Sequence, residues 1–276
     1  MKKTLLTLMI LAGLTHAAVS QEVLVSQETL TFVSETERDY WNAGKTNPYA
    51  LFRAVEAQSD ESGQIWEELV NELDQKASKK VDELNFLRMI FQKSHQKLLK
   101  KYQLHSTFNS MLSEGNYDCV SGSAALGLLL ERYGYSFDIV ETDFHVFIVV
   151  NLKGKNIVLE STLPIGGMIT TPSEVEKYLD AYKPKEFSAL KSLNQGLAGP
   201  NIDYSDNSIF RKVNLQQLAG LQYYNDAIVH FNSQAFGQAV EQLSKAYLLY
   251  PSDRILGLRE LSVDLAYKTY GYDLKK

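Results

Sequence analysis

Three residues of this chain carry side chains that together can perform nucleophilic catalysis: Cys119, His145 and Glu160. Cys119 is the only cysteine in the sequence, so it has no partner for an internal disulfide. A lone thiol followed by a histidine and a carboxylate is a candidate nucleophile, because an imidazole can take the thiol proton and a carboxylate can orient the imidazole. The three residue types therefore predict covalent catalysis by a thiol.

The residues after Cys119 predict a buried helix. Residues 119–133 are apolar nearly all round, as in a core helix, and Gly134 suits the position after its end. With Asp118 as the N-cap, the helix N-terminus favours a thiolate at Cys119, although the charge of Asp118 opposes it. The backbone N–H of Cys119 and the side chain of Asn116 are the candidate oxyanion donors.

After the helix, the hydrophobic pattern changes to a period of two residues, which predicts strands over residues 137–140, 144–150 and 156–162. A four-residue connection over 151–154 would place His145 directly opposite Glu160 on neighbouring antiparallel strands. A two-residue connection would place Thr162 opposite His145 instead, but would keep Glu160 on the same face as His145. In either register the carboxylate can hold one imidazole nitrogen.

Other interpretations of these residues remain open. A cysteine in an apolar helix is often a small buried hydrophobe, and a single histidine on a strand is often a core residue. Glu141, Asp143 and His145 alternate, so a straight strand would put them on one face, where they could bind a divalent ion. No second histidine lies close in sequence, so we predict neither a metal nor a cofactor.

The same residues resemble the transglutaminase-like superfamily. The segments that carry the resemblance are Gly-Asn-Tyr-Asp-Cys-Val-Ser-Gly-Ser-Ala (115–124), Leu-Leu-Leu-Glu-Arg-Tyr-Gly-Tyr (128–135), Phe-His-Val-Phe-Ile-Val (144–149) and Ile-Val-Leu-Glu-Ser-Thr (157–162). They are similar to that family's nucleophile helix, its histidine strand and the strand with its acidic residue. The resemblance covers roughly residues 105–165. It implies a papain-like α+β core and acyl transfer through a thioester, with Cys119, His145 and Glu160 as the triad.

The sequence departs from the family pattern in three ways. Glu160 stands where an aspartate is usual, and Phe147 is the aromatic residue soon after the histidine, where the family commonly has tryptophan. The interval from Cys119 to His145 is short, at 26 residues, which leaves little room for the loops of a large substrate site.

The N-terminus and the charge limit the classes of function. Lys2 and Lys3 precede an apolar run over residues 5–14 and small residues near position 20, which is typical of a secretory signal peptide. We therefore expect residues 1–20 to be removed and the protein to be exported, to the periplasm or the exterior. Removal of the two lysines leaves 26 basic and 33 acidic residues, a formal net charge of −7. Such a chain is a poor candidate for binding nucleic acid, and no later segment is apolar enough to span a membrane.

The hydrophobic pattern divides the mature chain into four parts. Residues 21–104 are mostly helical, 105–190 form the transglutaminase-like core, 191–212 are rich in Asn, Gly, Ser and Asp and read as a linker, and 213–276 are helical again. The last part resembles one tetratricopeptide repeat, with small and aromatic residues at interlocking positions and Pro251 at its end. One such repeat needs stacked neighbours, so the segment is either a helical hairpin packed on the core or a peptide-binding surface.

These features predict an α+β fold: a papain/transglutaminase-like core, in which the nucleophile helix packs on a small antiparallel sheet, with N-terminal helices and a C-terminal helical hairpin. The preferred function is that of an exported peptidase or amidase acting on a peptide or protein substrate. The alternative is a non-catalytic module that binds a protein partner through the C-terminal helices.

Overall fold

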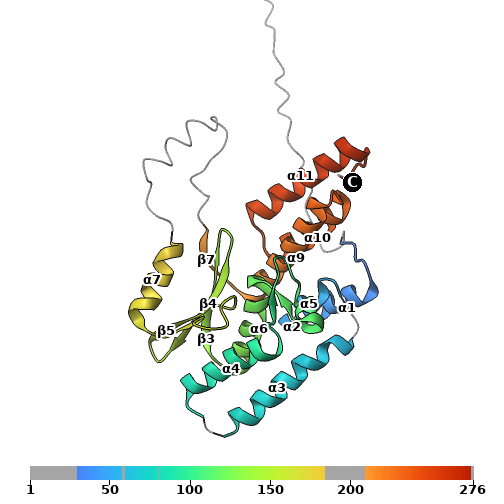
Figure 1. Cartoon of the computed structure of the whole chain (residues 1–276). Coiled ribbons are helices and arrows are strands. Elements are labelled where there is room, and N and C mark those ends of the chain that lie inside the picture. Colours follow the sequence, from blue (N-terminus) through green and yellow to red (C-terminus); the bar gives the residue numbers. More distant parts are fainter. Residues whose placement is uncertain (1–29, 58–59, 80, 184–208, 275–276) are drawn as a thin grey trace, which may run out of the picture.

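The computed structural model describes residues 30–57, 60–79, 81–183 and 209–274 (Figure 1). The predicted signal peptide and most of the predicted linker lie outside these residues. Within them, no helix is both long and apolar enough to cross a membrane.

The fold is α+β, as the sequence predicts, and it is built around one antiparallel sheet. The sheet has the strand order β6-β5-β4-β3-β7. The strands are β3 (Ser136–Thr142), β4 (Val146–Leu152), β5 (Lys155–Leu159), β6 (Met168–Ile169) and β7 (Phe210–Val213). β7 is a correction, because its residues fall largely in the segment 191–212 predicted as a linker. β7 pairs with β3, which lies far earlier in the chain, so the residues around β7 carry no signal of this pairing.

Helices cover both faces of the sheet (Figure 1). Alternate residues of β4 point to opposite faces: Ile148 and Val150 join the large core beneath α6 (Cys119–Arg132), and Phe147 and Val149 pack with α7 (Pro172–Tyr182). α7 is longer than the short helix predicted at residues 171–175. A sheet buried on both faces explains why β4 reads as a continuous apolar run.

The β4–β5 hairpin has the shorter of the two connections considered from the sequence. Lys153 and Gly154 form the turn with φ values of 52° and 80°, the left-handed geometry of a two-residue hairpin. Ile148 therefore pairs with Leu159, so the predicted opposition of His145 and Glu160 is wrong by two residues. Because that slip is even, both residues still belong to one face. They lie just beyond the paired strands, at the same end of the sheet.

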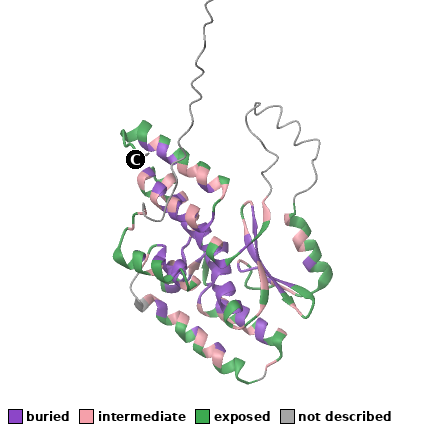
Figure 2. Ribbon diagram, turned by 180° about the vertical axis from the view of Figure 1, so that it is seen from behind, coloured by how far each residue is buried: buried purple, intermediate pink, exposed green. Residues whose placement is uncertain are grey.

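α6 is the central element of the core. Every residue from Cys119 to Leu130 is buried, and α6 contacts β3, β4 and helices from both ends of the chain. Figure 2 shows this concentration of buried residues between the sheet and the helical layers. The neighbouring helices include α4 (Glu83–Lys97), α5 (Phe108–Glu114) and α9 (Leu215–Asn232).

The remaining N-terminal elements confirm a mostly helical region before the core. They are α1 (Glu35–Ala43), α2 (Pro48–Ala54), η2 (Asp60–Gly63) and α3 (Gln64–Ala77). The short strands β1 (Lys101–Tyr102) and β2 (Asn116–Tyr117) pair in parallel, and β2 leads directly into α6. The sequence did not predict β1, β2, β6 or α5.

The C-terminal helices are α9, α10 (Phe236–Leu249) and α11 (Asp253–Tyr270). α9 packs against α6 and α2, so this segment is part of the core. Gln222 of α9 joins it to the N-terminal half: its amide oxygen accepts the Phe108 N–H at 2.9 Å, and its amide nitrogen donates to the Phe52 carbonyl at 3.0 Å.

A buried ion pair joins the N-terminal helix α1 to the C-terminal helix α10. Lys245 of α10 is fully buried, and its Nζ lies 2.6 Å from Oε1 of Glu37 in α1. The Lys245 ammonium also donates to Gln242 Oε1 at 2.9 Å, and Tyr223 donates to Glu37. Burial leaves neither charge access to water, so each depends on the other.

We expect Lys245→Ala to lower the free energy of unfolding by about 3–5 kcal/mol, because Glu37 would remain buried without its cation. Urea denaturation followed by circular dichroism measures the loss. Lys212→Ala is the matched control, because Lys212 forms its ion pair with Asp138 on the surface, and it should change the stability by less than about 1 kcal/mol. Equal effects of the two variants would contradict this role for Lys245.

Candidate active site

Asp118 determines where α6 begins and therefore where Cys119 lies. Its Oδ1 accepts the Ser121 N–H at 2.8 Å, and the Asp118 N–H donates to Ser121 Oγ at 2.9 Å, which completes a capping box. Asn225 of α9 donates to the other carboxylate oxygen at 3.0 Å. Burial raises the pKa of Asp118, although the hydrogen bonds from Ser121 and Asn225 oppose the increase. The N-cap predicted from the sequence is confirmed.

The first turn of α6 packs against the residues that flank His145 and Glu160. The Val146 N–H donates to the Cys119 sulfur, and Ser123 Oγ donates to the Val146 carbonyl at 3.3 Å. A Cβ at Gly122 would lie 2.8 Å from Ser161 Oγ, so only glycine permits this approach. The structure therefore places Cys119 beside the strand ends that carry His145 and Glu160. Within the described chain, however, no hydrogen bond joins the Cys119 thiol to His145.

The Cys119 thiol is protonated in this structure at neutral pH. The residue is only 8% exposed. Burial raises the pKa of the thiol to about 12, the negative charge of Asp118 adds to the increase, and the N–H groups of Val146 and Cys119 offset part of it. The expectation that the helix N-terminus would favour a thiolate is therefore wrong, because desolvation outweighs the helix dipole.

His145 and Glu160 form a close pair, as the sequence predicts. The distance from His145 Nε2 to Glu160 Oε2 is 2.6 Å, and Glu160 is only 2% exposed. The backbone N–H and the hydroxyl of Thr162 donate to Glu160 Oε1 at 2.8 and 2.5 Å. On the histidine side, the Thr142 N–H donates to the His145 carbonyl at 2.8 Å. Because Nε2 is engaged by the carboxylate, Nδ1 is the nitrogen left for a reacting group.

Two tyrosines of α7 complete the surroundings of this pair, and sequence reasoning missed both. The Tyr178 hydroxyl donates to Glu160 Oε2, the oxygen that also contacts His145. The Tyr182 ring stacks on the imidazole, with ring centroids 5.7 Å apart. Tyr178 and Tyr182 are four residues apart, so they share one face of the helix. The spacing alone indicates that the two rings lie on one side of α7. Only the packing of α7 on the sheet shows that this side faces His145 and Glu160.

These contacts keep Glu160 ionised despite its burial. Burial raises the pKa of the carboxyl, but the hydrogen bond and charge of His145 and the hydrogen bonds from Thr162 and Tyr178 outweigh it, so the pKa is below its ordinary value. An ionised carboxylate at this position can hold one nitrogen of the imidazole and so fix the orientation of the ring.

The candidate oxyanion donor Asn116 faces a different partner. Its amide nitrogen donates to Glu114 Oε2 at 2.6 Å on the surface, and within the described chain it has no hydrogen bond with Cys119 or His145. Of the two predicted donors, the N–H of Cys119 is therefore the one that lies at the sulfur.

The alternative metal site at Glu141, Asp143 and His145 is not formed. Glu141 is 1% exposed and binds Arg211 of the neighbouring strand β7. It also binds Tyr250 and Arg254, which link the sheet to the C-terminal helices. Asp143 accepts the Ile209 N–H at 2.8 Å. In the part of the chain that the structure describes, no cluster of three or more His, Cys, Asp or Glu side chains is arranged to hold a metal.

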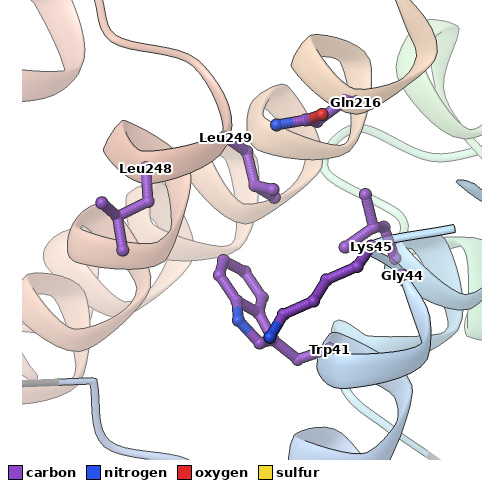
Figure 3. Close-up of a pocket in the computed structure, with 7 residues that line it drawn as sticks. Trp41, Gly44, Lys45, Gln216, Leu248 and Leu249 are labelled. Carbon is purple, nitrogen blue, oxygen red and sulfur yellow. The ribbon is translucent and has the colours of Figure 1, made fainter. Parts of the chain in front are cut away.

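A separate pocket of about 330 Å³ lies between the N-terminal helices α1 and α2 and the C-terminal helices α9 and α10 (Figure 3). The residues that line it are Trp41, Gly44, Lys45, Leu51, Gln216, Leu248 and Leu249. None of them belongs to the Cys–His–Glu set, so this pocket lies outside the candidate active site.

Comparisons with protein-family models, with curated proteins and with solved structures found no significant match to this chain. The assignment of the candidate site therefore rests on the geometry of its own residues.

We expect Tyr178→Phe to destabilise the protein by about 1.5–3 kcal/mol near pH 7, because it removes a hydrogen bond to a buried carboxylate. The lowered pKa of Glu160 stabilises the folded state above the ordinary carboxyl pKa, and this contribution is lost as the pH falls. The cost of Tyr178→Phe should therefore begin to shrink as the pH falls below the ordinary carboxyl pKa of about 4.5 and should continue to shrink at lower pH. Urea denaturation at pH values on both sides of 4.5 measures this change.

Tyr135→Phe is the control for this measurement. Its hydroxyl donates to the Glu83 carbonyl, away from any carboxylate of the site, so its cost should not vary between pH 4 and pH 7. A Tyr178→Phe cost that is equally independent of pH would contradict the assigned hydrogen bond.

The raised pKa of Cys119 predicts a characteristic pH profile for alkylation. Only the thiolate reacts, so the rate with iodoacetamide should rise continuously from pH 7 to pH 10, without the plateau expected just above the pKa of a free thiol, about 8.5. Intact mass spectrometry measures the rate, and because the chain has one cysteine, every added mass reports on Cys119. A plateau anywhere between pH 7 and pH 10 would overturn the neutral-thiol assignment.

Proposed function

We propose that this protein is a cysteine-dependent acyl-transfer enzyme, a peptidase or amidase, with a transglutaminase-like active site. The observation that carries the proposal is the 2.6 Å contact between His145 Nε2 and Glu160 Oε2 at the strand ends against which the N-terminus of α6 packs. The family resemblance of residues 105–165 supports the same chemistry. The exported location and the peptide or protein substrate belong to the proposal as well.

In the first half-reaction the Cys119 sulfur attacks a carbonyl carbon and forms a C–S bond, and the thiol proton passes to Nδ1 of His145. Because the resting thiol is neutral, proton transfer and attack have to proceed together. Glu160 stabilises the resulting imidazolium through Nε2. The imidazolium then protonates the leaving amine as its C–N bond breaks, which leaves a thioester on Cys119.

In the second half-reaction a nucleophile resolves the thioester. Water loses a proton to His145 and forms a C–O bond to the carbonyl carbon. The C–S bond then breaks, which releases the acid, and His145 returns the proton to the Cys119 sulfur. An amine in place of water would give cross-linking by the same route. The N–H of Cys119, at the N-terminus of α6, is the proposed donor to the oxyanion.

One observation favours the alternative function, a non-catalytic binding module. Cys119 is buried and its pKa is raised to about 12, as expected for a structural cysteine. In a binding module, His145 would have no effect on the reactivity of the Cys119 thiol. The two functions therefore predict different reaction rates for His145→Ala.

The proposed test is the hydrolysis of p-nitrophenyl acetate, a general acyl donor. The wild-type protein should release p-nitrophenol in a burst equal to the protein concentration, followed by slower turnover of the thioester. Cys119→Ser should abolish the burst. His145→Ala should slow it by about 10²- to 10⁴-fold at pH 7, because the general base is lost. Glu160→Gln should slow it to a smaller extent.

His230→Ala provides the matched control, because His230 lies on α9, where it pairs with Asp226. This variant should keep the wild-type burst. If His145→Ala reacts as fast as the wild type, or if Cys119→Ser keeps the burst, the acyl-transfer function is wrong and the binding module is favoured.

A further inference from the structure

Exposed apolar side chains gather on the segments that carry the candidate active site. Phe144, directly before His145, is 97% exposed, and Ile165 is 92% exposed. The other large apolar residues exposed on these segments are Tyr102, Leu104 and Leu163. Exposed groups of large apolar residues are uncommon on soluble proteins and usually mark a binding surface.

The antiparallel sheet brings Phe144 and Ile165 to the same end. Phe144 lies at the tip of the β3–β4 connection, which the Thr142–His145 hydrogen bond closes. Ile165 lies in the loop after β5, and antiparallel pairing of β4 with β5 puts the start of one strand beside the end of the other. The Glu160 N–H donates to the Gly167 carbonyl at 2.8 Å, so this loop folds back onto the Glu160 backbone.

Tyr102 lies on the side of the site that α6 forms. Tyr102 pairs in β1 with Tyr117 of β2, two residues before Cys119, and the two rings are 5.9 Å apart. The β1–β2 pairing therefore holds Tyr102 beside the segment that leads directly into Cys119. Apolar groups therefore flank both the nucleophile and the His145–Glu160 pair.

The acidic groups beside Phe144 and Ile165 are engaged within the protein. Glu160 is buried and is hydrogen-bonded to His145, Thr162 and Tyr178, and the Asp143 carboxylate accepts the Ile209 N–H. The large exposed side chains nearest to His145 and Glu160 in sequence, Phe144, Leu163 and Ile165, are aromatic or aliphatic. A ligand that removes them from water gains free energy by the hydrophobic effect.

We propose that the substrate is an apolar peptide segment, with aromatic or branched aliphatic side chains next to the carbonyl that Cys119 attacks, and that Phe144 and Ile165 select it. This inference rests on the proposed acyl-transfer function and specifies its substrate class. Phe144 and Ile165 would bind the substrate through its apolar side chains and would not need a charged group on it. The backbone of the substrate would then remain free to place its carbonyl at Cys119.

The test uses N-acetyl aminoacyl vinyl sulfones with Phe, Leu, Asp or Lys side chains. The Cys119 sulfur adds to the vinyl β-carbon, a proton is taken up at the α-carbon, and intact mass spectrometry follows the adduct. The Phe and Leu probes should react at least about tenfold faster than the Asp and Lys probes, in line with the gain from burying an apolar side chain. The double variant Phe144→Ser/Ile165→Ser should lose this preference while its iodoacetamide rate stays unchanged.

The matched control is Leu261→Ser/Tyr267→Ser, which removes two exposed apolar residues of α11 and should keep the preference. If the four probes react equally with the wild type, or if the double variant keeps the preference, the apolar substrate class is wrong although acyl transfer stands. If no probe labels the wild type and His145→Ala also leaves the acetate burst unchanged, the proposed function fails and this inference fails with it.

Discussion

The rest of the structure depends on one constraint: the N-terminus of α6 is buried, so its free N–H groups cannot be satisfied by water. Asp118 satisfies one of them, the Ser121 N–H, and the buried carboxylate in turn accepts hydrogen bonds from Ser121 and Asn225. Asn225 belongs to α9, far along the chain. The position of Cys119 is thus secured by a side chain from the C-terminal helices, which explains why this segment packs on the core. A detached tetratricopeptide-like hairpin could not supply that contact.

The same burial sets the chemistry of the thiol. Desolvation and Asp118 keep Cys119 protonated, whereas three hydrogen-bonding residues keep Glu160 charged. The two ionisable groups thus differ because the carboxylate receives several donors and the sulfur faces mainly apolar surroundings and backbone N–H groups. In the proposed function, a neutral thiol together with a histidine that is hydrogen-bonded to a carboxylate suits general-base activation, in which charge develops only when substrate is present.

The sheet and α7 together build the other half of the site. His145 and Glu160 lie beyond the last residues that pair between β4 and β5, and their backbones bond instead to Thr142 and Gly167. α7 positions the side chains, because Tyr178 donates to the carboxylate and Tyr182 stacks on the imidazole. The apolar layer under α7, formed by Phe147, Val149 and Val175, anchors the helix that carries both tyrosines.

By itself the sequence determined the elements whose signals are local: the buried helix that starts at Cys119, its Asp118 cap, the β4–β5 hairpin and the shared face of His145 and Glu160. These follow from periodicity, capping and the pleat of a strand. Only the tertiary structure decided the register of the hairpin, the edge strand β7, the tyrosines of α7, the partner of Asn116 and the protonation of Cys119. Each of these depends on which distant segment packs against the residue or on how much water is excluded there, and neither quantity is encoded in the neighbouring residues.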